Sequence, residues 1–422
     1  MIDAALLKGT HDRECVFEAF TRRLPAGRRY GVLAGTGRLL DLIDQFRFGD
    51  AELEWLREHE VVRDATLDWL ADYRFTGSIR GYHEGEVFFP NSPFLIVDAP
   101  FAEGVILETL ILSVFNYDSA VASAAARMVT AAGGRPVAEM GSRRANERSA
   151  VAAARAAFIA GFSATSNLEA GRSWGVPTMG TAAHAFTLLH DSEEDAFRAQ
   201  VDALGPGTTL LVDTFDVENA IDLAVKVAGP ELGAVRLDSG DLPNLVRRVR
   251  DQLDGLGATK TKITVTNDLD EFTIAALSAS PVDSYGVGTS VVTGSGYPAS
   301  GMVYKLVAHR SHDGDGEWIS VAKKSDGKAT VGGRKHPIRR HDANGRAIAE
   351  AIHIVEDDAR PDDTGRDLLV PLITDGVVHQ EHLGAAGTAA ARAHREKAMS
   401  ELPDQAFRVS RGDPVLPTIY IP

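Results

Sequence analysis

Between residues 136 and 287, short apolar runs alternate with longer amphipathic segments. In the longer segments, apolar residues recur at helical spacing. The runs are Pro136–Met140, Ala157–Phe162, Val176–Met179, Thr208–Val212, Ala234–Leu237, Lys262–Val265 and Ser284–Val287. The later runs begin about 22 to 28 residues apart, close to the roughly 30 residues of a βαβ unit. This pattern predicts an α/β fold and favours a closed, irregular parallel (β/α) barrel over an open sheet.

The regions on either side of this alternation have a different pattern. Before it, the sequence predicts a strand at Val16–Phe20 and helices at Leu39–Phe48, Ala51–Tyr73, Glu103–Phe115 and Ser119–Ala132. After it, the sequence predicts antiparallel strands at Met302–Ala308 and Glu317–Ala322 and a helix at about Gly387–Leu402. We expect an N-terminal α/β domain over residues 1–100 and a catalytic barrel over 101–300. We expect residues 301–422 to pack back on the N-terminal domain, which would make that α/β domain discontinuous.

The stretch from Gly233 to Leu253 has the pattern of a strand that ends in polar residues and leads into a helix. An apolar run that contains Arg236 is followed by Asp238, Ser239 and Gly240, and then by a helical pattern. A carboxylate, a hydroxyl and a glycine thus lie where a parallel strand ends, a position suited to sugar and phosphate groups. A structural interpretation is also open, in which Asp238 or Asp241 only caps the helix and Arg236 is a paired core charge.

Polar residues and glycines follow every predicted strand of the barrel. The segments are Gly141-Ser142-Arg143-Arg144, 163–167, Gly180-Thr181-Ala182-Ala183-His184, 213–216, 238–241, Asn267-Asp268 and Gly286-Val287-Gly288-Thr289. Because the carboxyl ends of barrel strands converge on one mouth, we expect these residues to line a single site.

The residue types at this mouth suit a phosphorylated sugar and a carboxylate. Arg143 and Arg236 can clamp a planar carboxylate and a diphosphate, since guanidinium groups match both. Asp238 can then accept bonds from ribose hydroxyls, and Gly288 and Thr289 can bind a 5′-phosphate through backbone N–H groups. His184 follows Gly180-Thr181, where the chain can approach a phosphate, and its imidazole can act as a nucleophile or an acid/base. A lone histidine at a helix start is also commonly structural.

Composition narrows the classes of function. The net charge of -15 argues against a general nucleic-acid or anionic-membrane binder, so the expected partner is a small molecule. Cys15 is the only cysteine, which fits a reducing compartment. The N-terminal residues lack the pattern of a signal peptide, and Glu108 interrupts the apolar run at 105–115. We therefore expect a cytoplasmic protein.

Several motifs for other chemistry are absent from the sequence. It contains no P-loop and no dinucleotide-binding Gly-x-Gly-x-x-Gly after a first strand. A Schiff-base lyase barrel would need a lysine at the C-terminal end of a strand, whereas Lys262 begins its strand and Lys226 lies in a predicted helix.

The chain resembles the nicotinate phosphoribosyltransferases in several segments, which follow one another in the same order as in the family. The segments are Phe17-Glu18-Ala19-Phe20-x-Arg22-Arg23-Leu24-Pro25, 139–145, 161–167, Gly180-Thr181-Ala182-Ala183-His184, 236–241 and 285–289. The resemblance implies an irregular barrel packed on an α/β domain, and a homodimer with sites near the subunit interface. It implies that nicotinate and phosphoribosyl pyrophosphate give nicotinate mononucleotide and pyrophosphate in NAD salvage. ATP would be hydrolysed through a phosphohistidine with the help of Mg²⁺, and His184 occupies the phosphorylated position.

The resemblance also bears on specificity. Relatives that use nicotinamide place an acidic residue where Ser166 stands, and an acid there would repel a carboxylate.

The family commonly begins with a Thr-Asp-x-Tyr-Glu-Leu-Thr segment whose Tyr helps to hold the pyridine ring, and this sequence starts without it. The basic stretch from Lys323-Lys324 to Lys335 resembles a phosphate-binding segment of the family. A barrel that kept the fold and lost turnover is the alternative, which an assay of pyrophosphate release would exclude.

Overall fold

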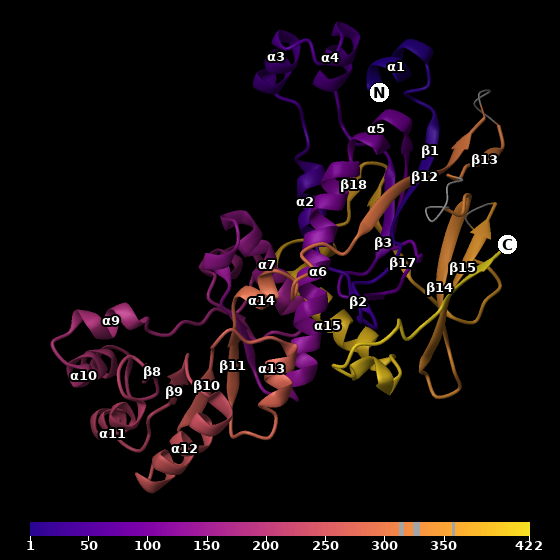
Figure 1. Cartoon of the computed structure of the whole chain (residues 1–422). Helices are drawn as coiled ribbons and strands as arrows, with labels where there is room; N and C mark the ends of the chain where they lie inside the picture. Colours follow the sequence, from indigo (N-terminus) through magenta and orange to yellow (C-terminus); the bar gives the residue numbers. More distant parts are fainter. Residues whose placement is uncertain (312–315, 324–329, 357–358) are drawn as a thin grey trace. The chain divides into compact units, whose positions relative to one another are not determined.

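The computed structural model describes residues 1–311, 316–323, 330–356 and 359–422 (Figure 1). The chain falls into two compact units. Unit 1 comprises residues 1–120 and 299–422, and unit 2 comprises residues 121–298. Each unit has its own sheet, so the two are described separately.

Unit 1 is built on a seven-stranded sheet with the order β13-β12-β1-β5-β3-β17-β18. Its strands are β1 (Glu14–Thr21), β3 (Ser78–Tyr82), β5 (Leu95–Pro100), β12 (Met302–Arg310), β13 (Trp318–Ser320), β17 (Leu369–Thr374) and β18 (Val377–Val378). The central strand β1 is buried over residues 15–21 and pairs antiparallel with β12 and β5. The predicted strand at Val16–Phe20 and the predicted antiparallel pair after residue 301 are confirmed.

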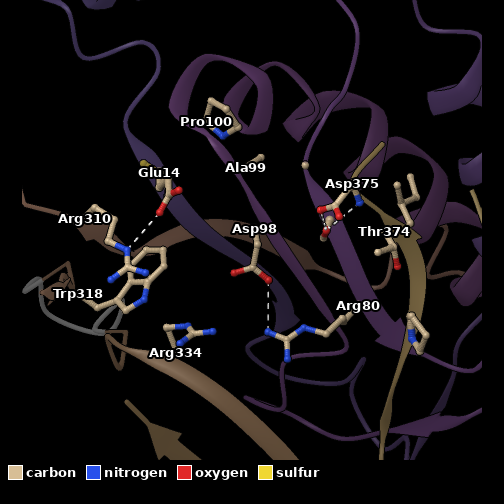
Figure 2. A pocket seen from close by; sticks show the side chains of 15 residues that line it. Glu14, Arg80, Asp98, Ala99, Pro100, Arg310, Trp318, Arg334, Thr374 and Asp375 are labelled. Carbon is tan, nitrogen blue, oxygen red and sulfur yellow. Dashed lines mark hydrogen bonds and ion pairs between the residues drawn. The ribbon is translucent and has the colours of Figure 1, made fainter. Parts of the chain in front are cut away.

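One end of this sheet is hollowed by a cavity of about 610 Å³, which we call the sheet-end cavity (Figure 2). Its polar side chains come from several strands and include Glu14, Arg80, Asp98, Arg310, Trp318 and Arg334.

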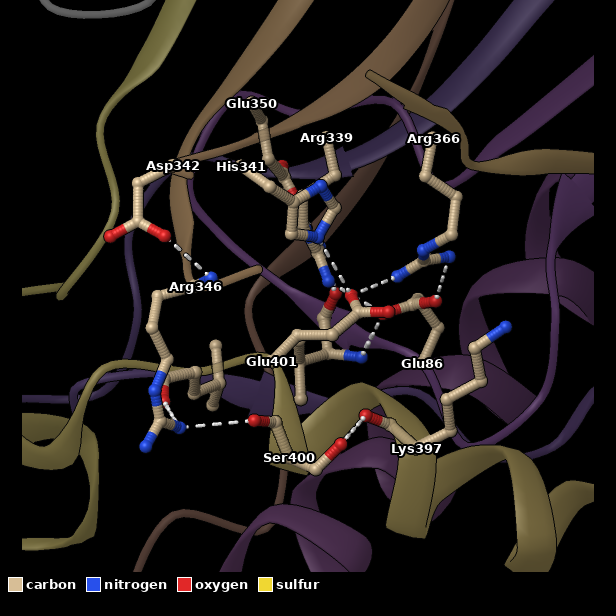
Figure 3. A network of polar contacts seen from close by, with 12 residues as sticks. Glu86, Arg339, His341, Asp342, Arg346, Glu350, Arg366, Lys397, Ser400 and Glu401 are labelled. Carbon is tan, nitrogen blue, oxygen red and sulfur yellow. Dashed lines mark hydrogen bonds and ion pairs between the residues drawn. The ribbon is translucent and has the colours of Figure 1, made fainter. Parts of the chain in front are cut away.

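A second sheet in unit 1 has the order β16-β14-β15-β19, and a short ribbon pairs β2 with β4. These strands are β14 (Arg334–His341), β15 (Ala347–Val355), β16 (Arg366–Asp367), β19 (Thr418–Ile421), β2 (Gly31–Val32) and β4 (Val87–Phe88). A buried ionic network lies beside them (Figure 3). Arg339 is fully buried and pairs with Glu86 and Glu350, and Glu86 also pairs with Arg366 and His394.

The helices of unit 1 differ in places from the prediction. They are α1 (Ile2–Lys8), α2 (Thr36–Asp44), α3 (Asp50–Glu58), α4 (Asp64–Ala71), α5 (Phe101–Ile106), the first part of α6 (Glu108–Ala132) and α15 (Gly384–Ser400). The single helix predicted at Ala51–Tyr73 is wrong, because Glu60 takes a left-handed φ of 49° and the chain breaks between α3 and α4. The predicted break at 115–119 is also wrong, since α6 is continuous and the break lies at Leu107.

The helical stretch over residues 101–132 is long enough and apolar enough to cross a membrane, judged by length and composition alone. A buried core helix meets the same criterion, and half of the apolar window is buried within the fold. Ile111, Val114 and Phe115 of α6 pack in the core beneath β1, β3 and β5.

Unit 2 contains a curled, open sheet of six parallel strands in the order β7-β6-β11-β10-β9-β8 (Figure 1). The strands are β6 (Val137–Glu139), β7 (Ala164–Thr165), β8 (Thr209–Leu211), β9 (Ala234–Leu237), β10 (Lys262–Val265) and β11 (Ser284–Val287). The helices are α7 (Glu147–Ile159), α8 (Leu168–Trp174), α9 (His184–Leu189), α10 (Glu193–Leu204), α11 (Val217–Ala228), α12 (Leu242–Gly255), α13 (Glu271–Ala276) and α14 (Thr289–Val292).

Two of the seven predicted barrel strands are wrong, and the prediction of a closed barrel fails with them. Most of Ala157–Phe162 lies in or directly after α7, where helix residues are buried on several sides and therefore read as a continuous apolar run. Val176–Met179 forms only a single parallel bridge, between Thr165 and Thr178. In the described chain, β7 and β8 are thus the two edges of the sheet, and the segment that leads to His184 connects them.

Candidate active site

A cavity of about 290 Å³ lies in unit 2, at the carboxyl ends of the parallel strands. Six of the predicted site residues line it together: Arg143, Ser166, Thr181, His184, Arg236 and Asp238. Met140, Ser142, Gly180, Ala182 and Ala183 complete the wall. The structure therefore brings together side chains that are spread over almost a hundred positions of the sequence, as the convergence of strand ends predicts.

Arg236 lies at the centre of this group. It projects from β9, and its side chain is 13% exposed. Its Nε donates to Thr266 Oγ1 at 2.8 Å, its Nη1 donates to Thr181 Oγ1 at 2.7 Å, and its Nη2 pairs with Asp238 Oδ1 at 3.1 Å. The guanidinium also donates to the carbonyl of Ala182 at 3.4 Å. Arg236 is paired, as the structural interpretation required, but it also lines the cavity and holds the segment before His184.

His184 is the first residue of α9 and is fixed by a carboxylate that the sequence interpretation did not select. Its Nε2 lies 3.1 Å from Asp213 Oδ1, and the side chain of Asp213 is only 1% exposed. An ionised carboxylate only accepts, so in the neutral imidazole this contact places the proton on Nε2 and leaves the lone pair on Nδ1. The other oxygen of Asp213 accepts from the backbone N–H of Asp238 at 2.9 Å and from Ser239 Oγ at 2.7 Å.

Thr266 is a residue of the site that the sequence analysis missed, and Asp213 was expected at the mouth only as part of the segment 213–216, without a role of its own. Asp213 follows the apolar run that ends at Val212, and Thr266 follows the run that ends at Val265. Thr266 accepts from Arg236 and donates to a carboxylate oxygen of Asp238, so it joins the two. The rule that selected Asp238, a polar residue at the C-terminal end of a strand, applies to Thr266 as well.

Glu139 supports the part of the wall that carries Arg143 and Ser166. It ends β6, is fully buried, and accepts from the backbone N–H of Gly141 and from Thr165 Oγ1. Burial raises the pKa of this carboxyl group, although both hydrogen bonds act in the opposite direction. The backbone N–H of Ser166 donates to the Glu139 carbonyl at 2.9 Å. The loop that carries Arg143 and the strand end that carries Ser166 are therefore tied to one carboxylate.

The remaining predicted site residues lie outside the lining of this cavity. Ser239 donates to Asp213, the partner of His184, and Gly240 has a left-handed φ of 91°. Gly288 precedes the short helix α14, which begins at Thr289. A Cβ atom at Gly288 would lie 3.4 Å from the carbonyl oxygen of Met140, so the loops after β11 and β6 are in close contact.

The basic stretch after residue 322 lies in unit 1, and its members differ in environment. Lys335 is fully buried, and its Nζ donates to Glu18 Oε2 at 2.6 Å and to the Val331 carbonyl at 2.8 Å. Its Nζ also donates to the Gly333 carbonyl at 3.3 Å, so its three protons all have partners within unit 1, and phosphate binding by the basic stretch stays a prediction. Lys323 is exposed, and Lys324 lies outside the described residues.

Comparisons with known proteins agree on one family. A model of the nicotinate phosphoribosyltransferase N-terminal domain matches residues 1–116. The chain is 53% identical to nicotinate phosphoribosyltransferase pncB1 of Mycobacterium tuberculosis, over 100% of this chain and 93% of that protein. It is 37% identical to nicotinate phosphoribosyltransferase of Bacillus subtilis, over 83% of this chain and 74% of that protein.

A solved structure has the same fold. The crystal structure of human nicotinic acid phosphoribosyltransferase superposes with a TM-score of 0.81 at 24% identity. The match covers 99% of this chain and 95% of that chain.

Proposed function

The chain belongs to the nicotinate phosphoribosyltransferase family and is a nicotinate phosphoribosyltransferase, and we propose that it couples the transfer to ATP hydrolysis through a phosphohistidine at His184. The observation that carries the proposal is that His184, which lines the cavity together with Arg143 and Arg236, pairs with the buried Asp213. Nicotinate and phosphoribosyl pyrophosphate would be the substrates, and nicotinate mononucleotide for NAD salvage the product.

The glycosyl transfer breaks the bond between the anomeric carbon and pyrophosphate and forms a bond from that carbon to the pyridine nitrogen. Positive charge develops on the ribose and negative charge on the leaving pyrophosphate. Asp238, at the strand end, would stabilise the ribose and hold its hydroxyls, and Ser239 and Gly240 follow it in the same turn. Backbone N–H groups near Gly288 and Thr289 would bind the 5′-phosphate.

Arg143 and Arg236 would bind the two negatively charged groups of the substrates, which are the carboxylate of nicotinate and the diphosphate. Ser166 stands beside them without a charge of its own, which favours an acid over an amide as the ring substituent.

Among the described residues, no three His, Cys, Asp or Glu side chains are grouped to hold a metal. Mg²⁺ therefore fits as an ion carried mainly by substrate phosphates, with Asp238 as a protein carboxylate near it, and it would neutralise charge on the leaving group.

The phosphoryl step uses the free nitrogen of His184. Because Nε2 donates to Asp213, the lone pair of Nδ1 would attack the γ-phosphorus of ATP, and the bond to ADP would break. The imidazole gains positive charge as this bond forms, and the carboxylate of Asp213 stabilises it. We further propose that the enzyme acts in the cytoplasm as a homodimer, as the likeness to its family suggests.

The test uses purified protein with nicotinate, phosphoribosyl pyrophosphate and ATP. We expect release of pyrophosphate and of nicotinate mononucleotide, and an acid-labile ³²P label from γ-labelled ATP. His184→Ala should lose the label and ATP hydrolysis and keep a measurable ATP-independent transfer. Full labelling of His184→Ala would refute the phosphohistidine, and an absence of any transfer in the parent would favour a barrel without turnover.

A further inference from the structure

The sheet-end cavity of unit 1 has the size of a metabolite site. Its volume of about 610 Å³ lies within the range of roughly 300–1,000 Å³ that is usual for small-molecule sites. It is lined from β1, β3, β5, β12, β13, β14 and β17, all of them in unit 1. None of its lining residues belongs to the active-site cavity, which lies in unit 2. The proposed transferase reaction gives this cavity no role.

Three guanidinium groups face this space. Arg310 and Arg334 both lie over the indole ring of Trp318, with their central carbons 4.4 Å and 5.2 Å from the ring centroid. In Figure 2, Arg334 and Arg80 extend toward the same space, and the Arg310–Trp318 pair lies at its side. A cation held by a ring face keeps its N–H edges directed at other partners. Glu14 pairs with one of these two arginines, so an incoming anion would compete with that carboxylate for Arg310.

Three carboxylates line the same cavity, those of Glu14, Asp98 and Asp375, and the first two pair with its arginines. Arg310 pairs with Glu14 at 3.1 Å, and the two side chains are 35% and 64% exposed. Arg80 pairs with Asp98 at 3.3 Å, and these side chains are 30% and 27% exposed. Exposed ion pairs contribute little to stability, and Glu14 is the most exposed of these four side chains, so a phosphate can replace Glu14 on Arg310 at small cost. The displaced carboxylate of Glu14, together with that of Asp98, is then an acceptor for hydroxyl groups on the same ligand.

We propose that the sheet-end cavity binds a phosphorylated metabolite of nucleotide size. Its phosphates would contact Arg80, Arg310 and Arg334, and its sugar hydroxyls would contact Asp98 and Glu14. Phosphate or pyrophosphate alone would fill a small part of the cavity and leave the carboxylates facing an anion. The combination of cations and acids on one wall therefore fits a nucleotide better than a bare anion. This site would be additional to the transferase site and does not depend on the proposed function.

Tryptophan fluorination gives a direct test on the full chain. The sequence has four tryptophans, so 5-fluorotryptophan labelling gives four ¹⁹F resonances, and Trp318→Phe identifies that of Trp318. ATP, NAD⁺ and inorganic pyrophosphate are titrated separately. We expect ATP or NAD⁺ to shift the Trp318 resonance saturably, and pyrophosphate to bind much more weakly. Arg80→Gln and Arg310→Gln should each raise the apparent Kd about 10-fold or more, because each removes charge-assisted bonds.

The controls separate this site from the active site and from misfolding. Arg236→Gln, in the active-site cavity, and Arg248→Gln, in an exposed ion pair of unit 2, should leave the Trp318 titration unchanged. The resonances of Trp55, Trp69 and Trp174 report that each variant is folded, and Arg80→Gln and Arg310→Gln should keep transferase activity. The proposal is overturned if neither nucleotide shifts Trp318 at millimolar concentration, or if pyrophosphate binds as tightly as they do. It is also overturned if the shift survives both arginine changes or is lost in Arg236→Gln.

Discussion

Asp213→Asn tests whether the buried carboxylate prepares His184 for phosphorylation. One oxygen of Asp213 already accepts from the backbone of Asp238 and from Ser239, at 2.9 Å and 2.7 Å. In the variant, the amide oxygen will keep these two bonds, and the NH₂ group will point at Nε2 of His184. Nε2 must then accept, which moves the imidazole proton to Nδ1 and removes the nucleophilic lone pair. The change therefore alters the tautomer and leaves the shape of the site intact.

The magnitude follows from the contact that is lost. The carboxylate lies 3.1 Å from Nε2 and is almost fully buried. Two unit charges about 4 Å apart interact by about 4 kcal/mol at an effective dielectric constant near 20. We expect a loss of about 2 to 4 kcal/mol in the transition state of phosphorylation, which is a fall of about 30- to 1,000-fold in rate. The same substitution in the serine-protease triad lowers the rate through the wrong tautomer in the same way.

The assay is the initial rate of acid-labile ³²P incorporation from γ-labelled ATP. Asp216→Asn is the matched control, because Asp216 lies three residues away and caps α11 through the N–H of Asn219. We expect the control to label within about twofold of the parent, since asparagine caps a helix about as well as aspartate does. Labelling of Asp213→Asn at the parent rate would refute the tautomer argument and leave Asp213 with a purely structural role.

Three further predictions concern specificity, binding and stability. Ser166→Asp should lower kcat/KM for nicotinate about 100-fold by repelling its carboxylate, with little change in the KM for phosphoribosyl pyrophosphate; equal nicotinate kinetics would contradict this. Arg236→Lys should lower kcat/KM about 10-fold or more, because a point charge cannot bond Thr266, Thr181 and Asp238 together; an unchanged value would make Arg236 a core charge only. Arg339→Met should reduce the free energy of unfolding by about 3 to 5 kcal/mol in chemical denaturation, because Glu86 and Glu350 are left buried without it; Arg248→Met, at an exposed pair, should change it by less than about 1 kcal/mol.

The order of the elements in unit 2 was predictable because apolar runs of a parallel sheet are short and are followed by polar residues. Five of the seven predicted runs contain a strand of the sheet. The two failures have physical causes. The Ala-rich helix α7 is buried on several faces, so the sequence at its C-terminal end has the continuous apolar pattern of a buried strand. Val176–Met179 lies in the gap between the sheet edges and makes a single bridge, and no local pattern indicates that a strand partner is missing.

The candidate site was predictable to the level of side chains that face the cavity. Residues behind them were harder to find, because their role depends on contacts between distant strands. Asp213 meets His184 across 29 positions, and Glu139 meets Thr165 across 26. The pairing of Lys335 with Glu18 spans 317 positions, and in the sequence Lys335 stands out only as part of a basic stretch that resembles a phosphate-binding segment. The sequence shows that Lys335 is charged, and only the fold shows which carboxylate it pairs with.

The open edge between β7 and β8 has a consequence for local stability. The segment before His184 is joined to the sheet by one bridge at Thr178, and beyond it by the side chains of Arg236 and Asp213. Such bonds contribute about 1 to 3 kcal/mol each, so this segment can detach at far lower cost than the strands beside it. Its amide hydrogens will then exchange with solvent through local opening. Those of β9 and β10 will exchange only when the whole sheet unfolds. The histidine is thus carried by a segment that few bonds hold to the sheet, and its position depends on the side chains of Arg236 and Asp213.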